Sequence, residues 1–149
     1  MKKQLISTSR TQTIDLAQHL AGHLFNGCVI TLSGDLGAGK TTFTQGLGHG
    51  LGITKLISSP TFTIMKQYHG RLDLIHIDAY RLEGLHQDLG LDELIGTDGV
   101  CVIEWPEQIP HLIPAEHLAI TIKRLTEDKR QLTIESTGSA YDALLEVIQ

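Results

Sequence analysis

Apolar residues recur along the chain in short runs, and their spacing alternates between a helical and a strand-like period. The first run, Leu5–Ser7, predicts a short edge strand. After it, apolar side chains recur every three or four residues, which predicts an amphipathic helix. This helix is expected to begin with Ser9 or Thr11 as its N-cap and to run to about Leu24.

Two runs are apolar or β-branched without interruption, at Cys28–Leu32 and Val100–Ile103. Such runs are typical of strands that are buried on both faces of a sheet. A glycine-rich loop follows the first run, and a helix is expected to start near Lys40 and to end in the glycine-dense stretch 46–52.

Four further segments predict strands that come in pairs. Phe62–Tyr68 and Leu72–Ile77 are separated by the turn residues His69-Gly70. Leu118–Ile122 and Gln131–Glu135 are separated by a charged turn and are expected to form a closing antiparallel pair.

Two more helical segments are expected, a short one within Gly84–Ile95 and a C-terminal one at Tyr141–Ile148. Strands that alternate with helices predict a layered α/β fold. We expect a central sheet that is mainly parallel, with antiparallel strands at its edges. A length of 149 residues fits a single domain, spanning residues 1–149.

The charge balance limits the partners of this domain. The formal net charge is −5, from 12 basic and 17 acidic residues, and the basic residues form no cluster. A protein that grips a nucleic acid by itself must neutralise several phosphates, so autonomous binding of tRNA or DNA is not expected. No apolar stretch approaches the length of a membrane span, and we expect a cytoplasmic protein without a membrane partner.

The loop after the first buried strand carries the clearest chemical signal. Residues 34–41 match the pattern G-x-x-x-x-G-K-[ST], and the strand–loop–helix context is the one that this phosphate-binding motif requires. A glycine-rich turn with a surface lysine is the alternative. The motif predicts the three-layer sandwich of P-loop NTPases and a nucleotide site whose candidate residues are Gly37, Ala38, Gly39, Lys40, Thr41 and Thr42.

Each residue type in the loop has a chemical reason. Glycines allow backbone N–H groups to point at phosphate oxygens, and the helix N-terminus adds a positive dipole. Lys40 is expected to reach the β- and γ-phosphates, and Thr42 the α-phosphate. The hydroxyl of Thr41 is the expected Mg²⁺ ligand, with ATP as the substrate.

Two acidic residues follow apolar runs and are candidates for the carboxylate that a P-loop requires. Glu104 is favoured for the Mg²⁺ shell, because its run is continuously apolar and therefore central. Asp78 would then orient or deprotonate the attacking water, or contact the nucleotide, and the two roles remain exchangeable. Either carboxylate alone could merely cap a turn. The candidate catalytic residues are Lys40, Asp78 and Glu104.

Three further places are candidate site residues. Ser59, Thr61 and Thr63 form a hydroxyl-rich segment that suits a switch-like loop over the γ-phosphate, or an ordinary surface turn. Trp105, the only tryptophan, fits a core position or an anchor for a partner. Arg130 is a candidate nucleotide contact, with a solvated turn as the alternative.

The sequence also separates classes of P-loop protein. A GTPase needs N-K-x-D to read guanine, but the only asparagine, Asn26, is followed by Gly27, so ATP is expected. A small-molecule kinase is an alternative, although the five arginines are well separated and little sequence is left for an acceptor pocket. A non-catalytic module gated by nucleotide is a second alternative, because no arginine finger is evident.

Four motifs together resemble the TsaE (YjeE) family in order and spacing. These motifs are Gly34–Thr42, Ser59–Thr63, Asp78–Leu82 and Ile103–Glu107. The resemblance extends from about residue 28 to residue 106 and is weak in the N-terminal helix and in the last forty or so residues.

The resemblance implies a bacterial ATPase that is needed to form N6-threonylcarbamoyladenosine at position 37 of tRNAs reading ANN codons. It implies TsaB and TsaD as partners that carry out the transfer, so that this chain meets tRNA only through the complex. Hydrolysis would be slow alone and faster with the partners. By the same resemblance, Thr41 and Glu104 would bind Mg²⁺, Asp78 would lie at the nucleotide, and Ser59–Thr63 would form the switch-like loop.

Overall fold

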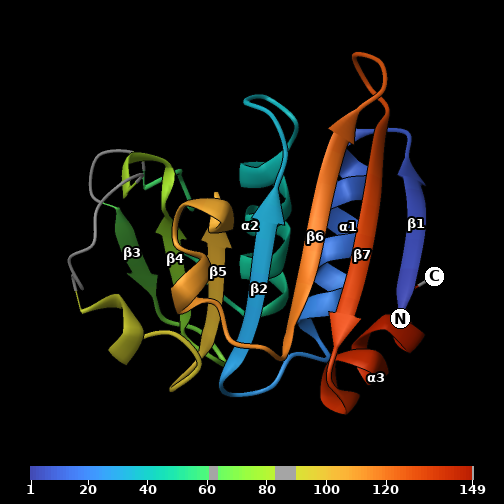
Figure 1. Cartoon of the computed structure of the whole chain (residues 1–149). Helices are drawn as coiled ribbons and strands as arrows, with labels where there is room; N and C mark the ends of the chain where they lie inside the picture. Colours follow the sequence, from blue (N-terminus) through green and yellow to red (C-terminus); the bar gives the residue numbers. More distant parts are fainter. Residues whose placement is uncertain (61–63, 83–89, 149) are drawn as a thin grey trace.

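A seven-stranded sheet forms the centre of the molecule, in the order β1-β7-β6-β2-β5-β4-β3 (Figure 1). The computed structural model describes residues 1–60, 64–82 and 90–148. The strands are β1 (Lys2–Ser7), β2 (Cys28–Ser33), β3 (Met65–Tyr68), β4 (Leu74–Asp78), β5 (Val100–Glu104), β6 (His117–Arg124) and β7 (Arg130–Thr137).

The expected mixture of parallel and antiparallel strands is confirmed. Strands β6, β2, β5 and β4 run parallel to one another. The antiparallel neighbours are β3 at one edge and β7 with β1 at the other. The edge strand β1 is longer than the predicted Leu5–Ser7, because its backbone pairs with β7 as far as Lys2 opposite Glu135.

Helices α1 (Arg10–Ala21) and α2 (Lys40–Gly50) cover one face of the sheet side by side (Figure 1). The Ser9 side chain caps α1 by accepting a hydrogen bond from the amide of Gln12, at 3.1 Å. The helix ends at Ala21, three residues before the predicted Leu24. Helix α3 (Ser139–Val147) packs against β7. Among the described helices, none has the length and apolar character needed to cross a membrane.

The glycine-dense end of α2 lies inside the helix and sets how closely α1 approaches. A Cβ atom on Gly46 would lie 2.6 Å from the carbonyl oxygen of Ile14. One on Gly50 would lie 2.4 Å from the Cβ atom of Ala21. The prediction that the helix ends in this stretch is confirmed, since α2 ends at Gly50, and the glycines also let two helix backbones touch, which fixes α2 beside α1.

The opposite face of the sheet is covered over only part of its width. Short 3₁₀ turns, among them Leu91–Glu93 and Pro106–Gln108, pack over β4, β5 and the start of β2. This second core contains Ile77 and Ile103. It supplies the third layer of the predicted sandwich, built from turns rather than long helices.

Two predicted elements extend beyond the described residues. Of the helical segment predicted within Gly84–Ile95, residues 84–89 lie outside the described ranges, and the described part contains the 3₁₀ turn Leu91–Glu93. Of the strand predicted from Phe62, the described part contains β3, which begins at Met65. The next strand begins later than predicted and includes Asp78 as its last residue.

Candidate nucleotide-binding site

The loop between β2 and α2 has the backbone form that the glycine pattern predicts. Gly34 has φ 148° and Gly39, at the N-cap of α2, has φ 113°, both in the left-handed region. A Cβ atom on Gly34 would lie 2.4 Å from the carbonyl oxygen of Ile122 on β6. Glycine at position 34 therefore lets the loop start directly against the neighbouring strand.

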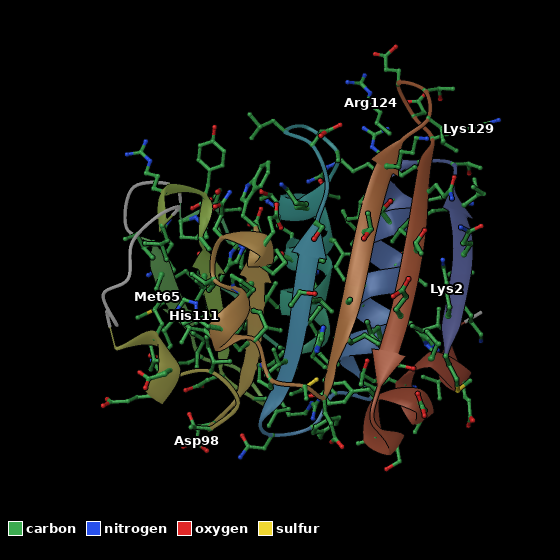
Figure 2. All side chains as sticks on the ribbon, in the orientation of Figure 1. Lys2, Met65, Asp98, His111, Arg124 and Lys129 are labelled. Carbon is green, nitrogen blue, oxygen red and sulfur yellow. The ribbon has the colours of Figure 1, made fainter. Side chains whose placement is uncertain are left out.

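A pocket of about 610 Å³ opens beside this loop and gathers most of the predicted site residues. In Figure 2, the labelled Arg124 and Lys129 mark the β6–β7 turn, which lies at the same end of the sheet as the loop, whereas Asp98 lies at the opposite end. The lining residues that the sequence predicts are Gly37, Gly39, Lys40, Thr41, Thr42, Ser59, Asp78, Glu104, Trp105 and Arg130.

Other lining residues escape sequence reasoning. Ser9, Arg10 and Thr13 come from the start of α1, and Glu127 and Asp128 come from the β6–β7 turn. Nothing in their local sequence indicates a ligand, because only the packing of α1 beside α2 brings the N-terminus of α1 to the pocket.

Lys40 is the first residue of α2, and its side chain is buried, with 6% of its surface exposed. Its ammonium group donates a hydrogen bond to the carbonyl oxygen of Gly34, at 2.6 Å. It also lies 4.1 Å from the centre of the Trp105 ring, in a cation–π contact. Burial lowers the pKa of Lys40, and the negative charges of Glu104 and Asp78 partly offset that effect.

The two predicted carboxylates emerge together at the P-loop edge of the sheet. Asp78 ends β4 and Glu104 ends β5, and they are register partners on adjacent parallel strands. Both are buried, with 6% and 3% of their surfaces exposed, and both line the pocket. Asp78 Oδ1 also accepts a hydrogen bond from the amide of Tyr80, at 3.0 Å, so Asp78 caps a turn and faces the pocket as well.

Glu104 has a partner that sequence reasoning missed. His76, in the middle of β4, is completely buried, and its Nε2 lies 2.6 Å from Glu104 Oε2. The available signal is the alternation of β4, which puts Leu74, His76 and Asp78 on one face of the strand. A histidine one step before a site carboxylate on the same face is the pattern to look for.

Trp105 packs between the second core and the P-loop lysine. Its ring centre lies 5.0 Å from that of Tyr80, and its ring also contacts the Lys40 ammonium group. Its backbone has φ 57°, a left-handed conformation that is uncommon for a residue with a side chain. Such conformations cluster at functional sites, and here it follows Glu104 directly. Trp105 is thus both a packing residue and part of the pocket.

Arg130 braces the P-loop, and it also forms part of the exposed β6–β7 turn. Its Nε donates to the carbonyl oxygen of Ala38, at 2.9 Å. One terminal nitrogen donates to the carbonyl oxygens of Thr126, Glu127 and Lys129. The guanidinium group thereby joins the P-loop to the β6–β7 turn. Ala38 is buried, and its backbone takes part in this brace.

The predicted switch-like loop is only partly within the described residues. Ser59 lines the pocket, and neighbouring Ser58 accepts a hydrogen bond from Lys66 on β3, at 2.8 Å. Thr61 and Thr63 lie outside the described residues. The role of this segment as a switch stays a prediction.

The groups around the pocket suit Mg²⁺ bound together with a polyphosphate. Among the described residues, no group of three or more His, Cys, Asp or Glu side chains forms a metal cage. Mg²⁺ in nucleotide sites is usually held by one or two carboxylates together with the substrate phosphates and water. Thr41 and Glu104 supply one hydroxyl and one carboxylate at the pocket, which fits that ligand set.

Comparison with known proteins gives concordant matches. The family model described as "Threonylcarbamoyl adenosine biosynthesis protein TsaE" matches residues 7–132. A protein of Bacillus subtilis (strain 168), named tRNA threonylcarbamoyladenosine biosynthesis protein TsaE, is 46% identical over 147 residues, covering 98% of this chain and 92% of its own length. A protein of the same name from Treponema pallidum (strain Nichols) is 45% identical over 113 residues, covering 74% of this chain and 84% of its own length.

A solved structure matches the fold over nearly the whole chain. The crystal structure of YdiB from Bacillus subtilis superposes with a TM-score of 0.86 at 40% sequence identity. The match covers 99% of this chain and 94% of that one. It therefore includes the N-terminal helix and the closing strands, where the motifs alone carry little resemblance.

Proposed function

This chain belongs to the TsaE family, and we propose that it is an Mg²⁺-dependent ATPase required to form the threonylcarbamoyl group on adenosine 37 of ANN-decoding tRNAs, acting with TsaB and TsaD. One observation carries the proposal: the P-loop, Lys40 and the carboxylates of Asp78 and Glu104 meet around a single pocket. These are the parts that phosphoryl transfer to water requires.

The P-loop residues bind the polyphosphate of ATP in this proposal. The backbone amides at the start of α2 point at phosphate oxygens, and Lys40 moves its ammonium group from Gly34 to the β- and γ-phosphates. Thr42 donates to the α-phosphate. Thr41 and Glu104 hold Mg²⁺, which neutralises part of the phosphate charge when it is bound.

Asp78 is the residue that orients the attacking water. Its Oδ1 is fixed by the Tyr80 amide, which leaves the other oxygen to accept a proton from that water. The water oxygen attacks the γ-phosphorus, the bond to the β–γ bridging oxygen breaks, and ADP and phosphate result. Trp105 closes one side of the pocket and limits the access of bulk water.

Slow hydrolysis by the chain alone follows from the state of Arg130. Its guanidinium group already donates to four carbonyl oxygens, so it serves the P-loop rather than the γ-phosphate. A partner is therefore expected to complete the site. The net charge of −5 suits a chain that leaves tRNA to TsaB and TsaD. The proposed role puts the chain in the cytoplasm, together with the tRNA that its partners modify.

Phosphate release tests the proposal. The purified chain is expected to release phosphate from MgATP slowly, and faster when TsaB and TsaD are added. Glu104→Ala should remove the stimulated rate and reduce threonylcarbamoyladenosine in tRNA nucleosides separated by liquid chromatography. Thr121→Ala, on an exposed position of β6, is the matched control and should behave as the unchanged chain.

Two outcomes would overturn the ATPase assignment. Absence of phosphate release even with both partners would mark a nucleotide-gated binding module. Transfer of the labelled γ-phosphate to a small acceptor instead of water would mark a kinase.

A further inference from the structure

His76 lies at the boundary between the core and the pocket. On the face of β4 that is turned toward the helices, Leu74 precedes it in the core and Asp78 follows it at the pocket. Its imidazole has no exposed surface. Because burying a polar group without a partner costs free energy, a histidine in this position requires a specific reason.

The partner of His76 is a carboxylate of the pocket, reached diagonally across the sheet. His76 pairs in register with Val102, two residues before Glu104 on β5. The Glu104 side chain therefore extends back along the sheet until Oε2 lies 2.6 Å from His76 Nε2. A hydrogen bond from an imidazole N–H to a carboxylate is of the stronger, charge-assisted kind.

The surroundings of Nδ1, the second ring nitrogen of His76, indicate which of the two nitrogens carries the hydrogen. Nδ1 is buried and has no hydrogen-bond partner within the described parts of the chain. A hydrogen on Nδ1 would be a buried donor without an acceptor, whereas a hydrogen on Nε2 has one in Glu104. The ring is thus arranged as a donor whose single acceptor is the pocket carboxylate.

Without the hydrogen bond from His76, the ammonium group of Lys40 would attract the Glu104 carboxylate. Glu104 exerts the strongest charge interaction that opposes the effect of burial on the pKa of Lys40. Even so, no ion pair within 4 Å joins Lys40 to Glu104 in the described structure, where the close partner of Glu104 is His76. The hydrogen bond from β4 thus engages Oε2 of Glu104 with His76 rather than with the ammonium group of Lys40.

We propose that His76 is a positioning residue that holds Oε2 of Glu104 and so presents the other oxygen, Oε1, to a divalent cation bound with the nucleotide. This inference rests on the proposed function, since it deepens the role given there to Glu104. In metal sites, groups that orient a ligand in this way typically contribute 10- to 100-fold to metal affinity.

The test measures metal affinity rather than turnover. Mn²⁺ replaces Mg²⁺, and its affinity for the ADP complex of the whole chain is followed by electron paramagnetic resonance. His76→Leu is expected to weaken Mn²⁺ binding roughly 10- to 100-fold, while ADP affinity in excess EDTA stays close to that of the unchanged chain. His76→Gln, whose amide nitrogen can take the place of Nε2, should restore most of the loss.

Two further variants separate positioning from a general loss of structure. Ile77→Val, the next residue of β4 on the opposite face, is the matched control and should leave Mn²⁺ affinity unchanged. In the background of Glu104→Gln, His76→Leu should weaken Mn²⁺ binding no further, because the carboxylate it orients is gone. An additional loss in that background would overturn the proposal.

The remaining outcomes distinguish failure of the proposed function from failure of the inference about His76. If Mn²⁺ does not bind with ADP to the unchanged chain, the proposed function and this inference both fail. If Glu104→Gln weakens binding but His76→Leu does not, the proposed function stands and the inference fails. If His76→Leu does not fold, the shorter His76→Asn replaces it. Failure of both to fold, with His76→Gln stable, would make His76 a structural residue and overturn the proposal.

Discussion

The two halves of the sheet differ on the same face. In the inner half, formed by β4, β5 and β2, that face carries Ile77 and Ile103 and is buried under the 3₁₀ turns. In the outer half, formed by β6, β7 and β1, the same face carries Thr121 and Lys123, which are exposed, and the half-buried Thr133. Strand β2 is the strand of the inner half that borders β6, and it leads into the P-loop.

This difference explains why the pocket carboxylates lie at the ends of the inner strands. Strands β4 and β5 are buried on both faces, and apart from His76 their charged or strongly polar residues are the last ones, so Asp78 and Glu104 emerge from a dry environment in which charge interactions are strong. The outer strands are longer and alternate between apolar and polar residues, and water reaches their polar face. The outer half contributes to the pocket through its turn, from which Arg130 reaches the P-loop.

The largest effect on nucleotide affinity is expected where the inner half meets the nucleotide. Lys40→Ala removes the charged donor for the phosphates, and charged hydrogen bonds contribute roughly 1.5–3 kcal/mol, which corresponds to roughly 10- to 150-fold in affinity. Isothermal titration calorimetry with MgADP measures the loss. Lys123→Ala, on the open face of β6, is the control and should bind normally. Equal affinities for the two variants would contradict the assignment of the pocket.

The second prediction concerns the free energy of unfolding and compares two positions on the same face of the sheet. Ile103→Ala in β5 leaves a cavity under the 3₁₀ layer and is expected to lower the free energy of unfolding by about 2–5 kcal/mol. Thr121→Ala in β6 should change it by less than about 0.5 kcal/mol. Urea titrations of both variants check the difference. Similar losses would mean that the outer face is covered in solution.

Local patterns predict most of the inner half. Continuous apolar runs predict β2 and β5, and the position of a carboxylate at the end of such a run predicts that Asp78 and Glu104 meet beside the P-loop. Parallel strands make this inference possible, because their carboxyl ends share one edge of the sheet. The P-loop itself is a local motif whose residue types follow from phosphate chemistry.

Contacts between segments that are distant in the chain could not be predicted from the sequence. Arg130 and Ala38 are 92 residues apart in the chain, and only the closing of the sheet by β7 brings them together. The bond between His76 and Glu104 requires the exact register of two strands, which a single sequence does not fix. The glycines of α2 predict correctly where the helix ends, but the local pattern does not show the backbone of α1 that they accommodate.

A smaller effect is expected from the brace that the outer half provides. Arg130→Lys keeps the charge but loses the planar group that donates to Ala38 and to the turn at once. MgADP affinity is expected to fall by roughly 3- to 10-fold, because the loop must then be ordered on binding. Arg124→Lys, in the same exposed turn, is the control. Unchanged affinity of Arg130→Lys would show that the brace does not shape the P-loop.

The smallest effect concerns the stability of the chain without nucleotide as the pH is raised. Burial lowers the pKa of Lys40 below its ordinary value, so near that pKa the unfolded chain binds more protons than the folded one. The unfavourable contribution of Lys40 to stability is therefore present at neutral pH and diminishes as the pH rises toward about 10.5. Relative to Lys40→Met, the unchanged chain should gain stability as the pH rises from neutral toward the ordinary pKa of lysine, about 10.5, as measured by urea unfolding. Lys123→Met corrects for the loss of one lysine. Because bound ADP places negative charge beside the ammonium group, saturating ADP should reduce this gain, and a gain of the same size with ADP would contradict the position given to Lys40 at the phosphates.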